Sequence, residues 1–284
     1  MNENKTNINW YPGHMAKAKR LIKEQIDLVD IVLLVVDSRI PKSSYIKDID
    51  DFTSNKEKIL VMSKYDLCDK EVTEKWKKYY EDKGFKVLYS SINDSSFKGT
   101  LISEIEKSME KVNQKRKEKG LLPKKARVMV VGASNVGKST LINKIAGGKK
   151  VITGNTPGVT KSISTIKVND KVELLDTPGV LWPKIESDEE ALNLAAMTII
   201  KEEVLPLDRV AIHIMQKLSD NYKEVLKKEL GLDNFNLDEI EEEYEAISRY
   251  KSIPKLNGEV DYDRINKLII NLVKNEQIKN ISFD

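Results

Sequence analysis

The stretch Gly132-Ala133-Ser134-Asn135-Val136-Gly137-Lys138-Ser139 decides the fold. It matches the pattern G-x-x-x-x-G-K-[ST] and lies between a predicted strand at Arg127–Val131 and a predicted helix at Ser139–Ile145. Glycines let backbone N–H groups turn toward phosphate oxygens, and the helix N-terminus adds its dipole. We expect Lys138 to reach the β- and γ-phosphates of a nucleotide and the Ser139 hydroxyl to bind Mg²⁺. The other contacts predicted from this loop are Asn135, Val136, Gly137 and Thr140.

Aliphatic runs alternate with Lys/Glu-rich stretches of helical periodicity on both sides of this loop. The run Ile31–Val36 is wholly aliphatic, which is typical of a central parallel strand covered by helices on both faces. Further strands are predicted at Lys58–Met62, Lys86–Tyr89, Ala126–Val131 and Val172–Leu175, with an edge strand at Ile163–Val168. The pattern predicts an α/β fold with a doubly wound, mostly parallel sheet.

The strand pattern stops near residue 185, and helical periodicity dominates the rest of the chain. Ser187–Glu190 has the form of a capping box, and Asp261–Lys274 is the last clear helix, after a turn-rich interruption at Ile247–Gly258. We therefore expect an α/β domain over residues 1–184 and an all-helical domain over residues 185–284. Inside the first domain, a Lys- and Arg-rich connector at 111–126 is expected to follow a helix.

Composition narrows the class of protein. The chain has 48 Lys and Arg against 45 Asp and Glu, a formal charge of +3, which excludes a wholly cationic nucleic-acid coat. One cysteine and two histidines argue against a zinc site. The polar start of the sequence and its short apolar runs predict a soluble cytoplasmic protein with no membrane partner.

Two segments after the phosphate loop fit the sensing of a γ-phosphate. Asp176-Thr177-Pro178-Gly179 follows a predicted strand, where Asp176 can hold Mg²⁺ through water and the Gly179 N–H can contact the γ-phosphate. Thr160 lies between this segment and the phosphate loop. We expect its hydroxyl to complete the Mg²⁺ shell only when the γ-phosphate is present.

Base recognition is predicted before the phosphate loop. Ser63-Lys64-Tyr65-Asp66 follows a predicted strand, at the edge where open α/β sheets bind ligands. The Asp66 carboxylate can accept hydrogen bonds from guanine N1–H and the N2 amine, which adenine does not offer, and the Lys64 stem can lie along the purine. Asn93 and Asp94 follow the next strand and are placed to present a backbone N–H to the guanine oxygen.

The order of these motifs is rotated relative to an ordinary GTPase, in which the phosphate loop precedes the base-recognition Asp. Such a rotation preserves a sheet whose original termini lie close together. With Trp10–Lys17, Val36–Pro41 and Asp176–Pro183, the chain resembles the circularly permuted GTPases of the YlqF family, strongly from residue 8 to about 185 and loosely beyond. The resemblance implies a circularly permuted P-loop GTPase domain followed by an all-helical domain.

The resemblance also implies slow intrinsic GTP hydrolysis that the ribosome stimulates. Val180 and Leu181 stand where many GTPases have a water-orienting Gln, and the family likeness implies His14 as a catalytic substitute beside Lys138. Asn135 resembles the residue that holds K⁺ in related GTPases. Ser63 departs from the family, which usually has an Asn there that ties the base loop to the phosphate loop.

The partner that the resemblance implies is the maturing large (50S) ribosomal subunit, through rRNA and ribosomal proteins, with Mg²⁺ and GTP or GDP as ligands and no DNA. The basic connector and Lys223, Lys227 and Lys228 fit either rRNA phosphates or a solvated surface. Two alternatives stay open from the residues alone: a P-loop kinase or ATPase acting on a small molecule, and a non-hydrolysing nucleotide-gated scaffold. Competition between ATP and GTP would favour the first, and undetectable stimulated turnover the second.

Overall fold

The computed structural model describes residues 13–53, 55–91, 93–151, 164–179, 185–201 and 204–284. One sheet runs in the order β3-β2-β1-β4-β6-β5. Its strands are β1 (Ile31–Asp37), β2 (Glu57–Ser63), β3 (Lys86–Tyr89), β4 (Ala126–Gly132), β5 (Ser164–Lys167) and β6 (Val172–Asp176). All neighbours are parallel except β5, which pairs antiparallel with β6 at the edge. The predicted doubly wound, mostly parallel sheet is confirmed.

The central strand positions the phosphate loop. Every residue of β1 is buried, as expected of a strand covered on both faces. Val35 of β1 lies opposite Gly132, the last residue of β4. A Cβ atom at position 132 would lie only 2.5 Å from the Val35 carbonyl oxygen, so only glycine allows this close approach. The first glycine of the motif is thus required by strand packing.

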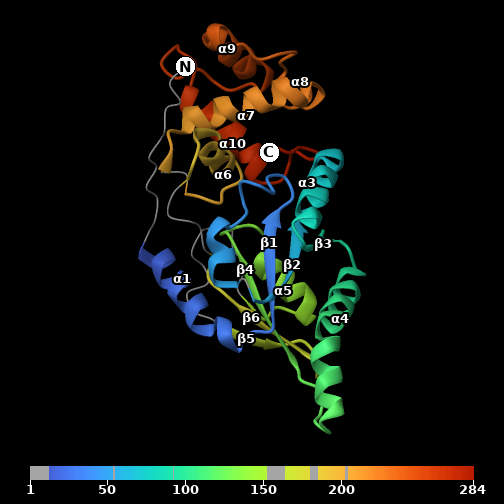
Figure 1. Ribbon diagram of the computed structural model, residues 1–284. Coiled ribbons are helices and arrows are strands. Elements are labelled where there is room, and N and C mark those ends of the chain that lie inside the picture. The colour runs from blue at the N-terminus through green and yellow to red at the C-terminus, as the bar shows by residue number, and fades with distance from the viewer. Residues whose placement is uncertain (1–12, 54, 92, 152–163, 180–184, 202–203) are drawn as a thin grey trace.

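Helices flank the sheet on both sides (Figure 1). They are α1 (Gly13–Gln25), α2 (Asp50–Thr53), α3 (Lys70–Asp82), α4 (Phe97–Glu118) and α5 (Lys138–Ala146), with 3-10 turns η1 (Ile26–Leu28) and η2 (Lys47–Ile49). Helix α4 continues beyond the sheet, so the expected connector at 111–126 is helical up to Glu118. Lysines and an arginine in the last turn of α4 suit the negative end of the helix dipole, which explains why the charged stretch stays helical.

Among the described residues after 187, the regular elements are all helices, joined by turns and irregular stretches, apart from one isolated bridge between Leu256 and Glu259. They are α6 (Asp188–Ala196), α7 (Leu207–Asn221), α8 (Lys223–Leu230), η4 (Leu237–Glu239), α9 (Ile240–Tyr250) and α10 (Tyr262–Lys274). Helix α9 reaches Tyr250, so the interruption expected from residue 247 begins only at 251. The reason is that Ile247 continues the buried face that Tyr244 begins, and the helix extends to bury both.

We call residues 185–284 the helical region. It lies over the carboxyl ends of the strands, toward which the arrow of β1 points (Figure 1). At its start, the Ser187 side chain accepts a hydrogen bond from the Glu190 N–H, as the capping box predicts. The Glu190 carboxylate accepts from the Glu186 N–H.

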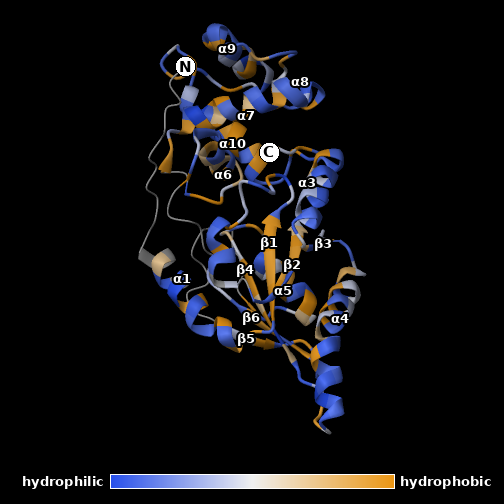
Figure 2. Cartoon of the chain, in the orientation of Figure 1, coloured by the Kyte–Doolittle hydropathy of each residue, from blue (hydrophilic) through white to orange (hydrophobic). Residues whose placement is uncertain are grey.

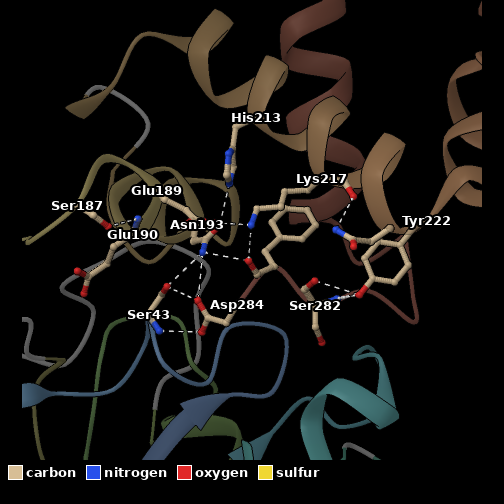
Figure 3. Close-up of polar contacts among 12 residues, drawn as sticks. Ser43, Ser187, Glu189, Glu190, Asn193, His213, Lys217, Tyr222, Ser282 and Asp284 are labelled. Atoms are coloured by element: carbon tan, nitrogen blue, oxygen red, sulfur yellow. Dashed lines mark hydrogen bonds and ion pairs between the residues drawn. The ribbon is translucent and has the colours of Figure 1, made fainter. Parts of the chain in front are cut away.

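The last described stretch, which we call the returning segment (residues 276–284), packs back onto loops of the α/β domain. The Ile281 N–H donates to the Leu67 carbonyl at 3.3 Å, and the Phe283 N–H donates to the Arg39 carbonyl at 2.8 Å. The Asp284 carboxylate accepts from the backbone N–H of Lys42 at 2.6 Å. It also accepts from the backbone N–H of Ser43 at 2.8 Å (Figure 3).

Apolar residues concentrate in the strands and on the inward faces of the helices (Figure 2). No helix within the described residues is long and apolar enough to cross a membrane.

Candidate functional site

The phosphate loop joins β4 to α5 in an alternating backbone conformation. Asn135 has φ +58 and Gly137 has φ +94, both in the left-handed region. Successive residues that alternate in this way turn their N–H groups toward one concave side, which binds anions. Gly137 is also the residue directly before α5, so the helix dipole points into the same concavity.

Lys138 is buried inside this loop. Its ammonium group donates to the carbonyl oxygens of Gly132 (2.9 Å) and Ala133 (2.5 Å). Burial lowers the pKa of Lys138 to about 8, and the charge of Asp176 only partly opposes that shift. The cation is therefore held by neutral carbonyls in a place that favours the arrival of an anion.

Asp176 ends β6 in a buried position, and no side chain among the described residues donates a hydrogen bond to its carboxylate oxygens. Burial raises the pKa of Asp176 to about 6, although the charge of Lys138 opposes the shift. A buried carboxylate without donors is costly unless a cation or a cation-bound water satisfies it. The donor set at the end of β6 thus fits Mg²⁺, together with the Ser139 hydroxyl at the start of α5.

The segment after β6 packs directly on the phosphate loop. A Cβ atom on Gly179 would lie 2.6 Å from the Ser134 Oγ and 2.9 Å from the Ser134 Cα, so no larger residue fits at 179. The Ser134 hydroxyl is buried and has no hydrogen-bond partner within the part of the chain that the structure describes. The Thr177 hydroxyl donates to the Val130 carbonyl at 2.7 Å and fixes the segment to β4. Thr160, Val180 and Leu181 lie outside the described residues.

A pocket opens beside the phosphate loop at the ends of β2 and β3. Its walls include the predicted base-contacting residues Lys64 and Asp66, and Thr140 from α5. Asn93 and Asp94 do not line it, and Ser90 and Ser91 stand in that place. The Asp94 carboxylate instead accepts from the N–H (2.9 Å) and hydroxyl (2.7 Å) of Ser96, and these bonds lower its pKa.

Ser63 connects the base side to the phosphate side. Its hydroxyl lies 2.8 Å from the Val36 carbonyl oxygen and also contacts the Val136 carbonyl of the phosphate loop. A serine hydroxyl carries one proton, so it donates to only one of these carbonyls at a time. The tie that the family usually makes with an Asn is present here in a single-donor form.

Lys64 sits in a left-handed backbone conformation (φ +54), and its ammonium lies 3.4 Å from an oxygen of Asp37. Arg39 holds the same buried carboxylate with two bonds, Nε to Oδ1 at 3.0 Å and Nη2 to Oδ2 at 2.8 Å. Burial alone would raise the pKa of Asp37, but the charges of Arg39 and Lys64 hold it well below its usual range. Asp37 and Arg39 lie in the segment Val36–Pro41 that carries the family resemblance, and no pattern in the sequence predicted this role.

Asn135 links the phosphate loop to the helical region. Its amide nitrogen donates to the carbonyl oxygen of Thr198 at 2.6 Å, in the turn after α6. His14 belongs to α1, and its side chain lies outside what the structure describes.

The chain matches the sequence profiles of two known protein families. A sequence profile of the RsgA GTPase family matches residues 15–186, and a profile of 50S ribosome-binding GTPases matches residues 127–252. Ribosome biogenesis GTPase A of Bacillus licheniformis is 40% identical, over 98% of this chain and 98% of its own length. This chain belongs to the ribosome biogenesis GTPase A family. The Thermotoga maritima relative is 30% identical, over 98% of this chain and 94% of its own.

A solved structure has the same fold as this chain. GNP-bound YlqF from T. maritima superposes with a TM-score of 0.65 at 26% identity, over 94% of this chain and 97% of that one. Family membership confirms the circularly permuted P-loop GTPase fold expected from the motif order. The chain is therefore a GTP-hydrolysing enzyme of ribosome assembly. Its family membership excludes the two alternatives, the small-molecule kinase and the non-hydrolysing scaffold.

Proposed function

We propose that this GTPase hydrolyses GTP on the maturing large (50S) ribosomal subunit, with rRNA and ribosomal proteins as partners. The observation that supports the chemistry is a buried pair of opposite charges: the Lys138 ammonium is held by loop carbonyls, and the Asp176 carboxylate has no side-chain hydrogen-bond donor among the described residues. A Mg²⁺-bound triphosphate brings both the anion and the cation that these groups need.

In this proposal the loop N–H groups of residues 135–140 cradle the phosphates, and Lys138 binds the β- and γ-phosphate oxygens. Ser139 and Thr160 supply hydroxyl ligands to Mg²⁺, which neutralises charge on the phosphates, and Asp176 holds the ion through water. The Gly179 N–H contacts the γ-phosphate. Its tight packing on Ser134 supports this role, because a shift of the phosphate loop would move position 179 as well.

The base lies in the pocket between Lys64, Leu141 and Ser91. Asp66, exposed at its rim, accepts from guanine N1–H and the N2 amine, while the Lys64 stem covers one face of the purine. The pocket lining favours a backbone N–H of the Ser90–Ser91 pair as the donor to the guanine oxygen. Asn93 and Asp94, predicted for that contact, lie next along the chain.

His14 positions the water that attacks the γ-phosphate, and the ribosome would bring it there. We assign this role to His14 because the side chain of Val180, directly after the Asp176–Gly179 segment, is apolar. K⁺ beside Asn135 would add positive charge in the transition state.

The deciding experiment measures GTP turnover with and without large ribosomal subunits, in KCl and in NaCl. We expect strong stimulation by the subunits, a faster rate in KCl, and loss of stimulation with retained GTP affinity in His14→Ala. Equal rates in both salts would remove K⁺ from the proposal. If large subunits do not increase the GTP turnover of the parent enzyme, the large subunit is not its partner.

Guanine recognition has its own test. Asp66→Ala should weaken GDP binding about 50-fold, since hydrogen bonds to a charged acceptor are worth roughly 1.5–3 kcal/mol. Fluorescence titration with labelled GDP measures the affinity, and ATP serves as the control because its base lacks the donor pair. Unchanged GDP binding in Asp66→Ala would place the base elsewhere.

For rRNA contact the exposed end of α4 is favoured over α8. Lys227 and Lys228 of α8 already pair with Asp233 (2.7 Å) and Glu229 (3.3 Å). Lys115 and Lys117 are exposed in the last turn of α4. Replacing both with Glu should reduce ribosome-stimulated turnover and leave intrinsic turnover unchanged.

A further inference from the structure

One wall of the base pocket comes from the helical region. Glu276 lines the pocket together with Lys64 and Asp66, although it follows α10 at the start of the returning segment. Its carboxylate oxygen lies 3.6 Å from the Lys64 ammonium. The site that we propose for guanine is therefore built from both parts of the molecule.

Glu276 completes a row of alternating charges. Arg39 pairs with the buried Asp37, the ammonium of Lys64 lies 3.4 Å from that same carboxylate, and Glu276 lies on the pocket side of Lys64. The exposed fraction of the side chain rises along the row, from 0% at Asp37 through 20% at Lys64 to 46% at Glu276. Two carboxylates thus hold one ammonium, and the direction of the lysine stem is set by both.

The backbone at Glu276 points to a use for its side chain. Its φ is +58, and its N–H donates to the Val273 carbonyl at 3.1 Å where α10 ends. Helices that end in this left-handed conformation usually place Gly or Asn there, because a Cβ atom costs about 1 kcal/mol. A long acidic side chain at a strained position calls for a compensating interaction, and the contact with Lys64 is one.

We propose that Glu276 is a positioning residue for the guanine nucleotide: it holds the Lys64 ammonium so that the lysine stem lies along the purine face. The inference rests on the proposed function, in which guanine binds against Asp66 and Lys64. Because the base is common to both nucleotides, losing Glu276 should weaken GDP and GTP equally. It should raise the KM for GTP while kcat is kept.

The test uses Glu276→Gly, Glu276→Gln and the control Glu259→Gln, which removes the same charge from an exposed position in the loop before α10. Titration with labelled GDP and GTP should show about threefold weaker binding for both Glu276 variants, the size of a partly exposed ion pair, and none for the control. Glycine suits the left-handed position, so Glu276→Gly should melt at or above the parent temperature. Weaker binding would then not reflect unfolding.

A double-mutant cycle ties the effect to its partner. In Lys64→Met, which keeps the stem and removes the charge, Glu276→Gln should have no further effect on nucleotide affinity. A persisting effect, or weakening of only one nucleotide, would overturn the inference, as would equal weakening in Glu259→Gln.

The inference and the proposed function fail separately. If Asp66→Ala loses GDP while both Glu276 variants bind like the parent, the positioning role is wrong and the guanine pocket stands. If Asp66→Ala binds GDP like the parent, the pocket itself is misplaced, and the role of Glu276 falls with it.

Discussion

The phosphate end and the base end of this site differ in how their polar groups are satisfied. At the phosphate end, Ser134 and Asp176 are buried without side-chain hydrogen-bond partners among the described residues, and Lys138 donates to two carbonyls of its own loop. At the base end, Ser63 and Lys64 are each held by partners from other segments. The phosphate end therefore depends on its ligand for charge balance, whereas the base end is organised in advance.

The difference follows from how each end is built. The phosphate end comes mainly from one continuous loop, whose backbone carbonyls hold the Lys138 ammonium, with Asp176 added from the end of β6. The base end collects Asp37, Lys64 and Glu276 from three separate stretches of chain, so charges of both signs meet there. We therefore expect that some mutations change nucleotide affinity without changing how the protein responds to the nucleotide, and that others do the reverse.

The largest effect is expected from Lys138→Met. Removing the charge-assisted bonds to phosphate should weaken GDP binding about 100-fold, yet the nucleotide-free variant should be more stable than the parent. The pKa of the buried ammonium is lowered to about 8, so the native state disfavours the charged form that prevails at pH 7. Titration and thermal melting of both proteins at pH 7 measure the two effects. A less stable variant would mean that the loop carbonyls alone satisfy the cation.

An intermediate effect is expected from Asp176→Asn, and it should depend on pH. The pKa of Asp176 is raised from 3.8 to about 6, so the native protein binds this proton more tightly than the unfolded chain. Stability therefore falls as pH rises between these values, and the loss is complete above pH 6. In metal-free urea unfolding, Asp176→Asn should stabilise the protein by about 2 kcal/mol at pH 7.5.

At pH 5 the same variant should gain only about half as much, since much of Asp176 is then protonated. Equal gains at both pH values would contradict the idea that an unpaired charge destabilises the phosphate end. Adding Mg²⁺ and GDP should stabilise the parent more than the variant.

The smallest effect is expected from Ser63→Asn. An amide has two N–H donors and can bond to the carbonyls of Val36 and Val136 together, whereas the hydroxyl serves one at a time. One added hydrogen bond should tighten GDP binding about threefold. Ser63→Ala is the matched control and should bind more weakly than the parent. If both variants bind alike, the tie between the two ends does not affect affinity.

Local patterns in the sequence predicted the sheet and the phosphate loop well. The strand at Lys86–Tyr89 matches its predicted bounds, and β1 differs by one residue, because buried aliphatic runs have few other places to pack. The last helix begins one residue after the predicted Asp261, which is its N-cap and accepts from the Arg264 N–H. These features depend on neighbours in sequence.

Contacts between segments that are distant in sequence could not be predicted from local patterns of this kind. Nothing around Glu276 distinguishes it from other acidic surface residues, and its contact with Lys64 exists only once the returning segment is packed. The bond between Asn135 and Thr198 is of the same kind. Ser90 and Ser91, directly after β3, line the pocket, whereas the sequence pattern singled out Asn93 and Asp94 a few residues later. The roles of His14 and Thr160 stay predictions.

The returning segment also determines at what point of its own synthesis the enzyme can complete its fold. A nascent polypeptide that has emerged only as far as α10 already contains both nucleotide loops, but it lacks the contacts that residues 276–284 make with Arg39, Lys64 and Leu67. Translation must pass this point before Glu276 can contact Lys64 and before Phe283 can bond to Arg39. In our proposal, a protein that serves ribosome production thus completes its guanine site only after a ribosome has read its message to these late codons.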